Sequence, residues 1–285
     1  LWGLCSLGYY LSGVTGIYAM MEAMATVSTG GYSLDRLVPI YNTVASQWVA
    51  IVFMLLGAIG FHTHFHAFFK RNTRVYIQQT EPKALLGVVL IVACIVALIA
   101  ASTQGNVDFT MILFEVVAFA TTTGFETELQ SVSPFMVVLF ALMGLCGGCS
   151  GSTAGGVKLI RVQVLLQEAK VLLTRLIYPN VMYSPSVNGR ALAASYVGNI
   201  RGHIALFVLT LIASLLLLVL MGVAVEQALY LVCATITNVG GSVGPLELAA
   251  LTHYQKFVLS IVMILGRLEI AALLVLCLPR YWRSS

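Results

Sequence analysis

Three short segments that are rich in hydroxyl side chains and closed by glycine could coordinate a cation. They are Val27-Ser28-Thr29-Gly30, Thr121-Thr122-Thr123-Gly124 and Thr237-Asn238-Val239-Gly240. A dehydrated cation needs several oxygen ligands at once, and backbone carbonyls from repeated loops around one axis can supply them. Glycine tolerates a positive φ, so the carbonyls before it can all point one way. The segments therefore predict a selectivity filter that binds K⁺ at these residues alone.

Each of these segments follows a short apolar run, over residues 17–25, 109–119 and 228–234. At about 1.5 Å per residue, a helix over 109–119 reaches only about half of a roughly 30 Å hydrocarbon core. Backbone that leaves a helix inside a membrane is tolerated only where it is buried in protein or faces water or an ion. We therefore expect short re-entrant helices, each aiming the negative end of its dipole at the turn, which favours a cation.

Longer apolar runs on either side predict complete membrane spans. These runs cover residues 43–69, 84–101, 135–173 with an interruption, 204–221 and 257–278, and a partial run ends near Gly13. Apolar residues make up 59% of the chain and charged residues only 9%, which excludes an ordinary soluble domain. The order span, short helix, turn, span occurs three times. The sequence predicts an all-α polytopic membrane protein with these repeated units around a central pore.

Basic residues indicate which side of the membrane each loop occupies. They gather in the loop from Lys70 to Lys83, in the segment from Lys158 to Arg201, and at Arg280 and Arg283. These regions are predicted to be cytoplasmic. Acidic residues lie mainly on the other side, where they would attract cations to an outer mouth; they are Asp35, Asp108, Glu126, Glu128, Glu226 and Glu247. The net charge of +4 is thus a sign of sidedness in the bilayer and predicts no nucleic-acid partner.

Residues 147–156 interrupt the second span of the second unit. They include Gly147, Gly148, Gly151, Ser152, Thr153, Gly155 and Gly156, and Lys158 follows them. Each glycine in a helix interior costs about 1 kcal/mol relative to alanine, so this stretch is predicted to leave the helix. One interpretation is a mobile gate across the conduction path. The other is a tightly packed crossing of helices through small residues.

Arg267 is a charged residue inside the last span, where charges are costly and usually face the bundle interior. An arginine that points into a cation path adds a positive barrier, so we count Arg267 with the gate. Alternatively, it forms a structural pair with a buried carboxylate or with carbonyls at a helix end. Glu269, two residues on, faces elsewhere on a helix.

Other reactive side chains give weaker signals. Cys146 and Cys149 have the spacing of a redox or zinc pair, but a second pair is missing, and small residues in a packed helix end explain them better. His62 and His66 share a helical face and could bind a metal, but they lack an accompanying carboxylate or cysteine, so two histidines at the membrane interface explain them better. Because no nucleophile has a base and an orienting group, we predict that the protein is not an enzyme. An ion-coupled carrier of another small solute remains the alternative function.

Taken together, these residues resemble the Trk/Ktr/HKT superfamily of potassium transporters, and most closely its bacterial TrkH/TrkG branch. The resemblance rests on Ser28-Thr29-Gly30-Gly31-Tyr32, Thr121-Thr122-Thr123-Gly124-Phe125, 151–158, 175–180, Asn238-Val239-Gly240, 266–270 and 279–283. It implies a pore of four repeats, each with one key glycine. Gly30, Gly124 and Gly240 would be those of the second, third and fourth repeats. The loop at 147–156 would be the gating loop and Arg267 the pore-lining arginine.

The resemblance also implies an organisation. The second repeat would cover residues 1–75, the third 76–178, a cytoplasmic connector 179–201 and the fourth 202–285, with no first repeat ahead of Leu1. Upstream residues or another chain would supply that repeat. The family implies potassium uptake across the bacterial inner membrane by a homodimer bound to a TrkA-like cytoplasmic subunit. Nucleotide would bind only to that subunit, and no cofactor is expected here. Both a channel and a symporter fit these residues.

Overall fold

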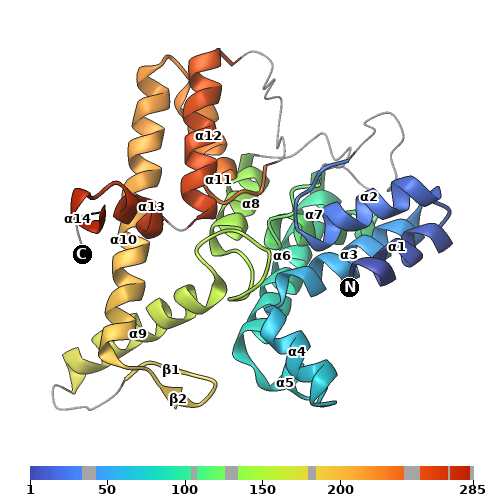
Figure 1. Cartoon of the computed structure of the whole chain (residues 1–285), viewed down its shortest axis with the longest axis horizontal. Coiled ribbons are helices and arrows are strands. Elements are labelled where there is room, and N and C mark those ends of the chain that lie inside the picture. The colour runs from blue at the N-terminus through green and yellow to red at the C-terminus, as the bar shows by residue number, and fades with distance from the viewer. Residues whose placement is uncertain are drawn as a thin grey trace.

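The computed structural model describes residues 1–33, 43–103, 108–125, 134–178, 184–240, 251–268 and 270–282 of the 285-residue chain. The described residues form helices joined by turns, with one small hairpin in the connector before α10 (Figure 1). Apart from this two-stranded hairpin, the predicted all-α membrane fold is confirmed.

The N-terminal part contains two helices before the glycine-containing segment at residues 28–31 and two helices after it. They are α1 (Trp2–Leu11), α2 (Gly16–Val27), α3 (Val44–Ala58) and α4 (Phe61–Phe69), after which comes the short α5 (Val75–Gln78). The middle part repeats this order with α6 (Thr80–Thr103), α7 (Phe109–Ala120), α8 (Pro134–Cys146) and α9 (Leu159–Ile177). In both parts a short apolar helix ends at a glycine-containing turn.

The C-terminal part begins with the hairpin, in which β1 pairs antiparallel with β2. Three longer helices and two short ones follow. The elements are β1 (Ser186–Val187), β2 (Arg190–Ala191), α10 (Ala194–Leu220), α11 (Val225–Ile236), α12 (His253–Arg267), α13 (Ile270–Leu276) and α14 (Pro279–Trp282).

Side chains that accept hydrogen bonds from backbone N–H groups fix the start of three helices. Thr43 Oγ1 accepts from Ser46 N at 3.2 Å at the start of α3, and an Asp108 carboxylate oxygen accepts from Thr110 N at 3.0 Å at the start of α7. Thr252 and Gln255 form a reciprocal capping box at the start of α12. Such caps satisfy N–H groups that have no partner within the helix.

Within the described residues, two helices are long and apolar enough to cross a membrane, α6 and α10. Two further pairs of helices are long and apolar enough only when taken together: α3 with α4, bent by 97°, and α12 with α13, bent by 105°. The apolar runs predicted over 43–69 and 257–278 thus have the expected length and composition, and each contains a bend. At the first bend the backbone of Ile59 is extended, with φ −86° and ψ 139°, so the helix stops there.

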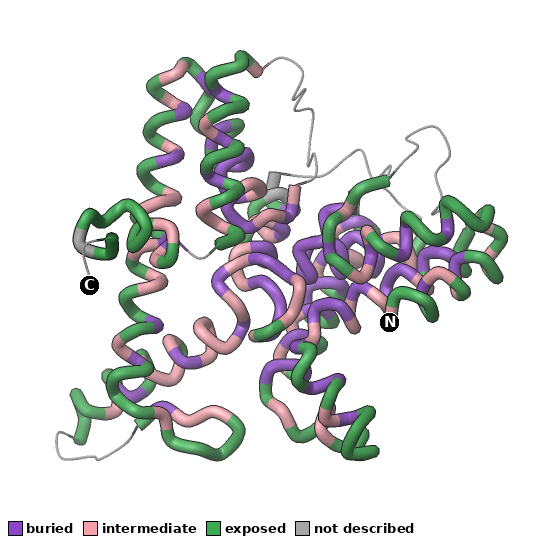
Figure 2. Tube along the Cα trace, in the orientation of Figure 1, coloured by how far each residue is buried: buried purple, intermediate pink, exposed green. Residues whose placement is uncertain are grey.

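The helix α7 lies at the centre of the molecule. All of its residues from Ile112 to Ala120 are buried, and it packs against α3, α6 and α8. The helix α11 makes the corresponding contacts with α8, α10 and α12. Figure 2 shows the buried segments gathered in the middle, while the outer turns of α10 and α12 are largely exposed. The helices α7 and α11 thus pack within their own parts of the chain and also against the preceding part.

Candidate functional site

The three glycine turns leave their short helices with the same backbone path. Each begins at a hydroxyl residue in the right-handed helical region: Ser28, Thr121 or Thr237. The next residue has a positive φ, which is 52° at Thr29, 55° at Thr122 and 56° at Asn238. Two residues later a glycine has a positive φ, 63° at Gly31, 70° at Gly124 and 65° at Gly240. We call residues 28–31, 121–124 and 237–240 the first, second and third turns.

Hydrogen bonds confirm that the turns are equivalent. Three residues before the hydroxyl residue stands an alanine, Ala25, Ala118 or Ala234, whose carbonyl receives the backbone N–H groups of the turn. Gly30 N and Thr123 N both donate to this carbonyl at 2.8 Å. The common pattern is therefore Ala-x-x-Ser/Thr-x-x-Gly.

The register of the first turn differs by one residue from the sequence prediction. Val27 is the last residue of α2 and lies before the turn, and Gly30 occupies the place of Thr123. The residue equivalent to Gly124 and Gly240 is Gly31. Two successive glycines made the sequence ambiguous, and only the backbone angles decide between them.

The three turns lie against one another. A Cβ added to Gly31 would collide with the carbonyl oxygen of Thr123, and a Cβ added to Gly124 would collide with the carbonyl oxygen of Val239. The first turn therefore contacts the second, and the second contacts the third. At Gly240 no described atom lies within 4 Å of an added Cβ. The turns converge on one region, and the series is open beyond the third.

The loop of residues 147–156, called the 147–156 loop below, fills the bend between α3 and α4. Cys149 N donates to Ala58 O at 2.9 Å, and Phe61 N donates to Gly151 O at 2.9 Å. A Cβ on Gly60 would collide with the carbonyl oxygen of Ser150. Backbone groups freed by the break in one span are thus satisfied by a loop from another span, as a membrane interior requires.

The 147–156 loop also contacts the second and third turns and the residue directly before the first turn. The Thr153 hydroxyl donates to Val27 O at 3.2 Å, directly before the first turn. Gly155 N donates to the Thr122 hydroxyl at 2.6 Å in the second turn. A Cβ on Gly155 would collide with Thr237 O in the third turn. The loop therefore lies across the side of the turns that is nearer to the ends of the short helices.

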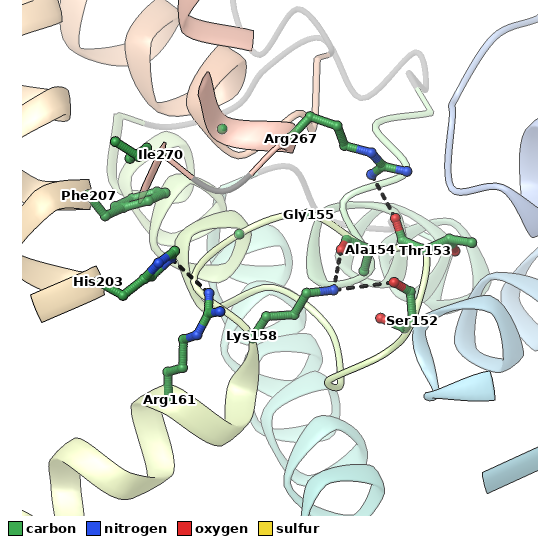
Figure 3. Close-up of a pocket in the computed structure, with 12 residues that line it drawn as sticks. Ser152, Thr153, Ala154, Gly155, Lys158, Arg161, His203, Phe207, Arg267 and Ile270 are labelled. Carbon is green, nitrogen blue, oxygen red and sulfur yellow. Dashed lines mark hydrogen bonds between the residues drawn. The ribbon is translucent and has the colours of Figure 1, made fainter. Parts of the chain in front are cut away.

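Two cationic side chains bond to carbonyl oxygens of this loop (Figure 3). Arg267 donates from Nη1 to Thr153 O at 2.8 Å. Lys158 donates from Nζ to Ala154 O at 2.8 Å and to Ser152 O at 3.3 Å. Arg267 thus pairs with a loop carbonyl, a partner that neither sequence interpretation had named.

A cavity of about 200 Å³ adjoins these cations, lined by the loop and by residues of α9, α10, α12 and α13. Arg161 and His203 lie on another side of it, and Arg161 Nη1 donates to His203 Nε2 at 2.8 Å. Lys158, Arg161 and Arg267 therefore line one cavity beside the loop, which concentrates positive charge there.

The cysteines and histidines that the sequence singled out lie in packed or hydrogen-bonded positions. Cys149 is buried within the loop, and Cys146 is half-buried, both as free thiols. His64, between the two predicted interfacial histidines, contacts Leu56 O and the Tyr76 hydroxyl at 2.8 Å through its two ring nitrogens. It links α4 to α3 across the bend and to α5 on the other side of its ring.

Three buried carboxylates, Glu22, Glu81 and Glu115, were not assigned a role from the sequence. Glu22 is fully buried in α2, and the Ser33 hydroxyl donates to its Oε1 at 2.9 Å. Glu81, in the first turn of α6, accepts from Ser150 N at 2.8 Å. The sequence signal at Glu22 is one charge in an apolar run, while Glu81 gives none, because it looks like any acid at a helix start.

Some predicted residues lie outside the described part of the chain. These are Asp35, Glu126, Glu128, Pro179, Asn180, Glu247, Glu269 and Arg283. The connector predicted at 179–201 is described from residue 184 onward, where the hairpin and the start of α10 lie.

Known proteins that this chain resembles carry the name of Trk system potassium uptake proteins. The Trk system potassium uptake protein TrkH of Escherichia coli K12 is 31% identical over 98% of this chain and 60% of its own length. TrkH of Vibrio parahaemolyticus is 32% identical over the same shares, and TrkG of E. coli K12 is 27% identical. The chain thus spans about 60% of the length of these relatives.

A solved structure agrees with the sequence comparison. The crystal structure of the potassium transporter TrkH from V. parahaemolyticus has a TM-score of 0.93 at 30% identity, over 99% of this chain and 63% of that one. These relatives are transport proteins, which confirms that the chain belongs with transporters and not with enzymes. The sequence profile of the TrkH family, described as "Cation transport protein", matches residues 4–284. The chain belongs to the TrkH family of cation transport proteins.

Proposed function

We propose that this chain supplies three of the four turns of a potassium filter in a system that takes up potassium across the bacterial inner membrane. The main support is the contact between the turns, since Thr123 O lies against Gly31 and Val239 O against Gly124. Carbonyls that converge in this way can replace the water around K⁺. The relatives carry the name of potassium uptake proteins.

The filter assignment is 28–31, 121–124 and 237–240, with Gly31 in place of Gly30 as the key glycine of the first turn. The units then keep the proposed boundaries, 1–75, 76–178 and 202–285, with the connector at 179–201 between the last two. A fourth turn would close the ring beyond the third, where Gly240 has free space among the described residues.

We also propose that the 147–156 loop is the gate and that the structure has it closed. The loop touches the residue directly before the first turn and the second and third turns, at Val27 O, Thr122 and Thr237 O. The ammonium group of Lys158 takes two loop carbonyls that could otherwise face a permeating ion, and Arg267 holds a third. Opening then requires these cations and the loop to move together.

The remaining parts of the proposal follow from family membership. They are a homodimer and a TrkA-like nucleotide-binding subunit on the cytoplasmic side, where α9 and the hairpin carry basic residues such as Lys170 and Arg190. Potassium is the transported substrate, and no cofactor is assigned to this chain.

Ion flux in liposomes tests the proposal. The full-length transporter should carry K⁺ and Rb⁺ down a gradient and should not accumulate amino acids or sugars. Deleting residues 147–156 should raise basal flux and leave the preference for K⁺ over Na⁺ largely intact. Uptake of an organic solute would favour the carrier alternative, and unchanged flux after the deletion would remove the gate assignment.

A further inference from the structure

The N-terminal end of α6 binds the 147–156 loop through Glu81. Glu81 is only 6% exposed, and its Oε1 accepts a hydrogen bond from Ser150 N at 2.8 Å. An acid that served only the start of its own helix would remain in water, because burying a carboxylate is costly unless it is well paired. Here the carboxylate turns inward to a loop residue that lies 69 positions away. A bond between a charged acceptor and a backbone N–H is among the stronger hydrogen bonds in proteins.

The neighbouring residue, Thr80, ties the same turn to the cytoplasmic segments that follow the loop. Thr80 N donates to Asn188 Oδ1 at 2.9 Å, in the tip of the β1–β2 hairpin. Thr80 Oγ1 and Gln163 Oε1 are 3.3 Å apart, and Gln163 Nε2 donates to Thr80 O at 3.3 Å. Gln163 lies near the start of α9, the helix that continues directly from the loop.

The hairpin and α9 are fastened to each other as well. Ser186 N donates to Gln167 Oε1 at 2.8 Å, one helical turn beyond Gln163. The tip of the hairpin has the positive-φ pair Asn188 and Gly189, with φ 51° and 77°. Hence the loop, α9 and the hairpin all meet at two consecutive residues of α6, Thr80 and Glu81, which we call the α6 clamp.

We propose that the α6 clamp holds the 147–156 loop closed and connects it to the cytoplasmic hairpin, with Glu81 as the positioning residue. This rests on the proposed gate. A cytoplasmic displacement of the hairpin or of α9 pulls on Thr80, moves the adjacent Glu81 carboxylate away from Ser150 N and frees the loop. The clamp is thus the mechanical connection between the cytoplasmic surface and the conduction path.

Cysteine labelling measures release of the loop independently of transport. Cys149 directly precedes Ser150 and is 2% exposed, so it reacts slowly while the loop is held. In the full-length transporter with every other cysteine replaced, Glu81→Ala should raise the rate of Cys149 modification by a small methanethiosulfonate reagent at least about tenfold. Glu81→Gln keeps an acceptor oxygen and should stay within about threefold of the parent. Lys83→Ala, an exposed residue of the same helix, is the matched control.

Asn188→Gly provides a second arm if Glu81→Ala does not fold. Glycine accepts the positive φ at this position and removes only the side chain that binds Thr80 N. It should speed Cys149 modification by a smaller factor, and basal Rb⁺ flux should rise in both variants. Unchanged labelling in folded Glu81→Ala, or equal acceleration in Glu81→Gln, would overturn the clamp. Faster labelling with unchanged flux would keep the clamp and remove the proposed gate.

Discussion

The hydroxyl group at the start of each turn donates a hydrogen bond to a backbone carbonyl of the short helix that precedes the turn. Thr121 Oγ1 donates to Val117 O at 2.8 Å, and Thr237 Oγ1 donates to Cys233 O at 2.7 Å. Each of these carbonyls also accepts the backbone N–H of the same threonine, at 2.9 Å for Val117 O and 3.2 Å for Cys233 O, so the hydroxyl adds a second hydrogen bond to it. The carbonyls of the following residues, such as Thr123 O and Val239 O, then remain for contacts across the turns.

The glycine register in the first turn can be tested by two adjacent substitutions. Gly31→Ala places a Cβ at φ 63° and against Thr123 O, whereas the Cβ of Gly30→Ala meets only the mobile hydroxyl of Ser28 at 3.1 Å. A positive φ costs a residue with a Cβ about 1–2 kcal/mol before any collision. Rubidium uptake should fall at least about tenfold in Gly31→Ala and change less than about twofold in Gly30→Ala. A larger loss in Gly30→Ala would restore the register expected from the sequence.

Removing the guanidinium of Arg267 should loosen the loop. A hydrogen bond to a charged group contributes about 1.5–3 kcal/mol, and we take about 1 kcal/mol because this side chain is exposed in the chain described here. Arg267→Ala should therefore raise basal Rb⁺ flux roughly fivefold and leave the ratio of K⁺ to Na⁺ flux unchanged. Lys256→Ala, on the exposed side of the same helix, is the control. Folded Arg267→Ala protein with parental flux would mean that this bond does not hold the gate.

Among the elements, the apolar runs of the sequence located the spans and the short helices well. Length alone distinguishes α7, with 12 residues, from α6, with 24 residues, because only the longer helix can cross the bilayer. The bends were not predictable in the same way. The run over 43–69 is continuous in hydropathy, and its break at Ile59 and Gly60 depends on hydrogen bonds from a loop about 90 residues further along the chain.

The same limit applied to the candidate site. Residue types predicted where the turns lie, since hydroxyl residues before a glycine suit a cation. They did not predict Glu81, because its partner is a backbone N–H, which every residue except proline carries. The pattern Met-x-Leu-Gly occurs at both 54–57 and 263–266, and this repeat indicates equivalent positions in the two bent spans. Its glycines, Gly57 and Gly266, let the bent spans approach Val27 O and Ile236 O.

The bend between α3 and α4 should respond to extra volume at Gly60. Its φ of −57° and ψ of 134° suit any residue, so Gly60→Ala acts through collisions of the new Cβ with Ser150 O and with the His62 ring. Overpacking of this kind costs about 1–3 kcal/mol. Gly87→Ala is the matched control, because that helical glycine has no atom within 4 Å of an added Cβ. Thermal unfolding in detergent should show a lower midpoint for Gly60→Ala and an equal or higher one for Gly87→Ala. Equal unfolding midpoints for both variants would mean that the loop moves aside at the bend without a cost in stability.

At the scale of the whole molecule, the second and third re-entrant helices pack against the second span of the preceding part. The helix α7 contacts α3, and α11 contacts α8. The helix α2 is the first of the three, and in the described chain it exposes Ile17 at 74% and Met24 at 54%. By the same rule, a second span of a further unit should cover this face in the assembled transporter, on the side where the ring of turns is open.

Spin labels can show whether protein or lipid covers that face. A label at Met24→Cys of the full-length transporter in liposomes should have low accessibility to oxygen, which dissolves in lipid and is excluded from packed protein. Labels at Leu98 of α6 and Leu216 of α10, both strongly exposed, serve as references for lipid contact. The 285-residue chain alone should show high accessibility at all three positions. If the Met24 label in the full-length protein matched the lipid references, α2 would face the bilayer, and the ring of four turns would lose its geometric basis.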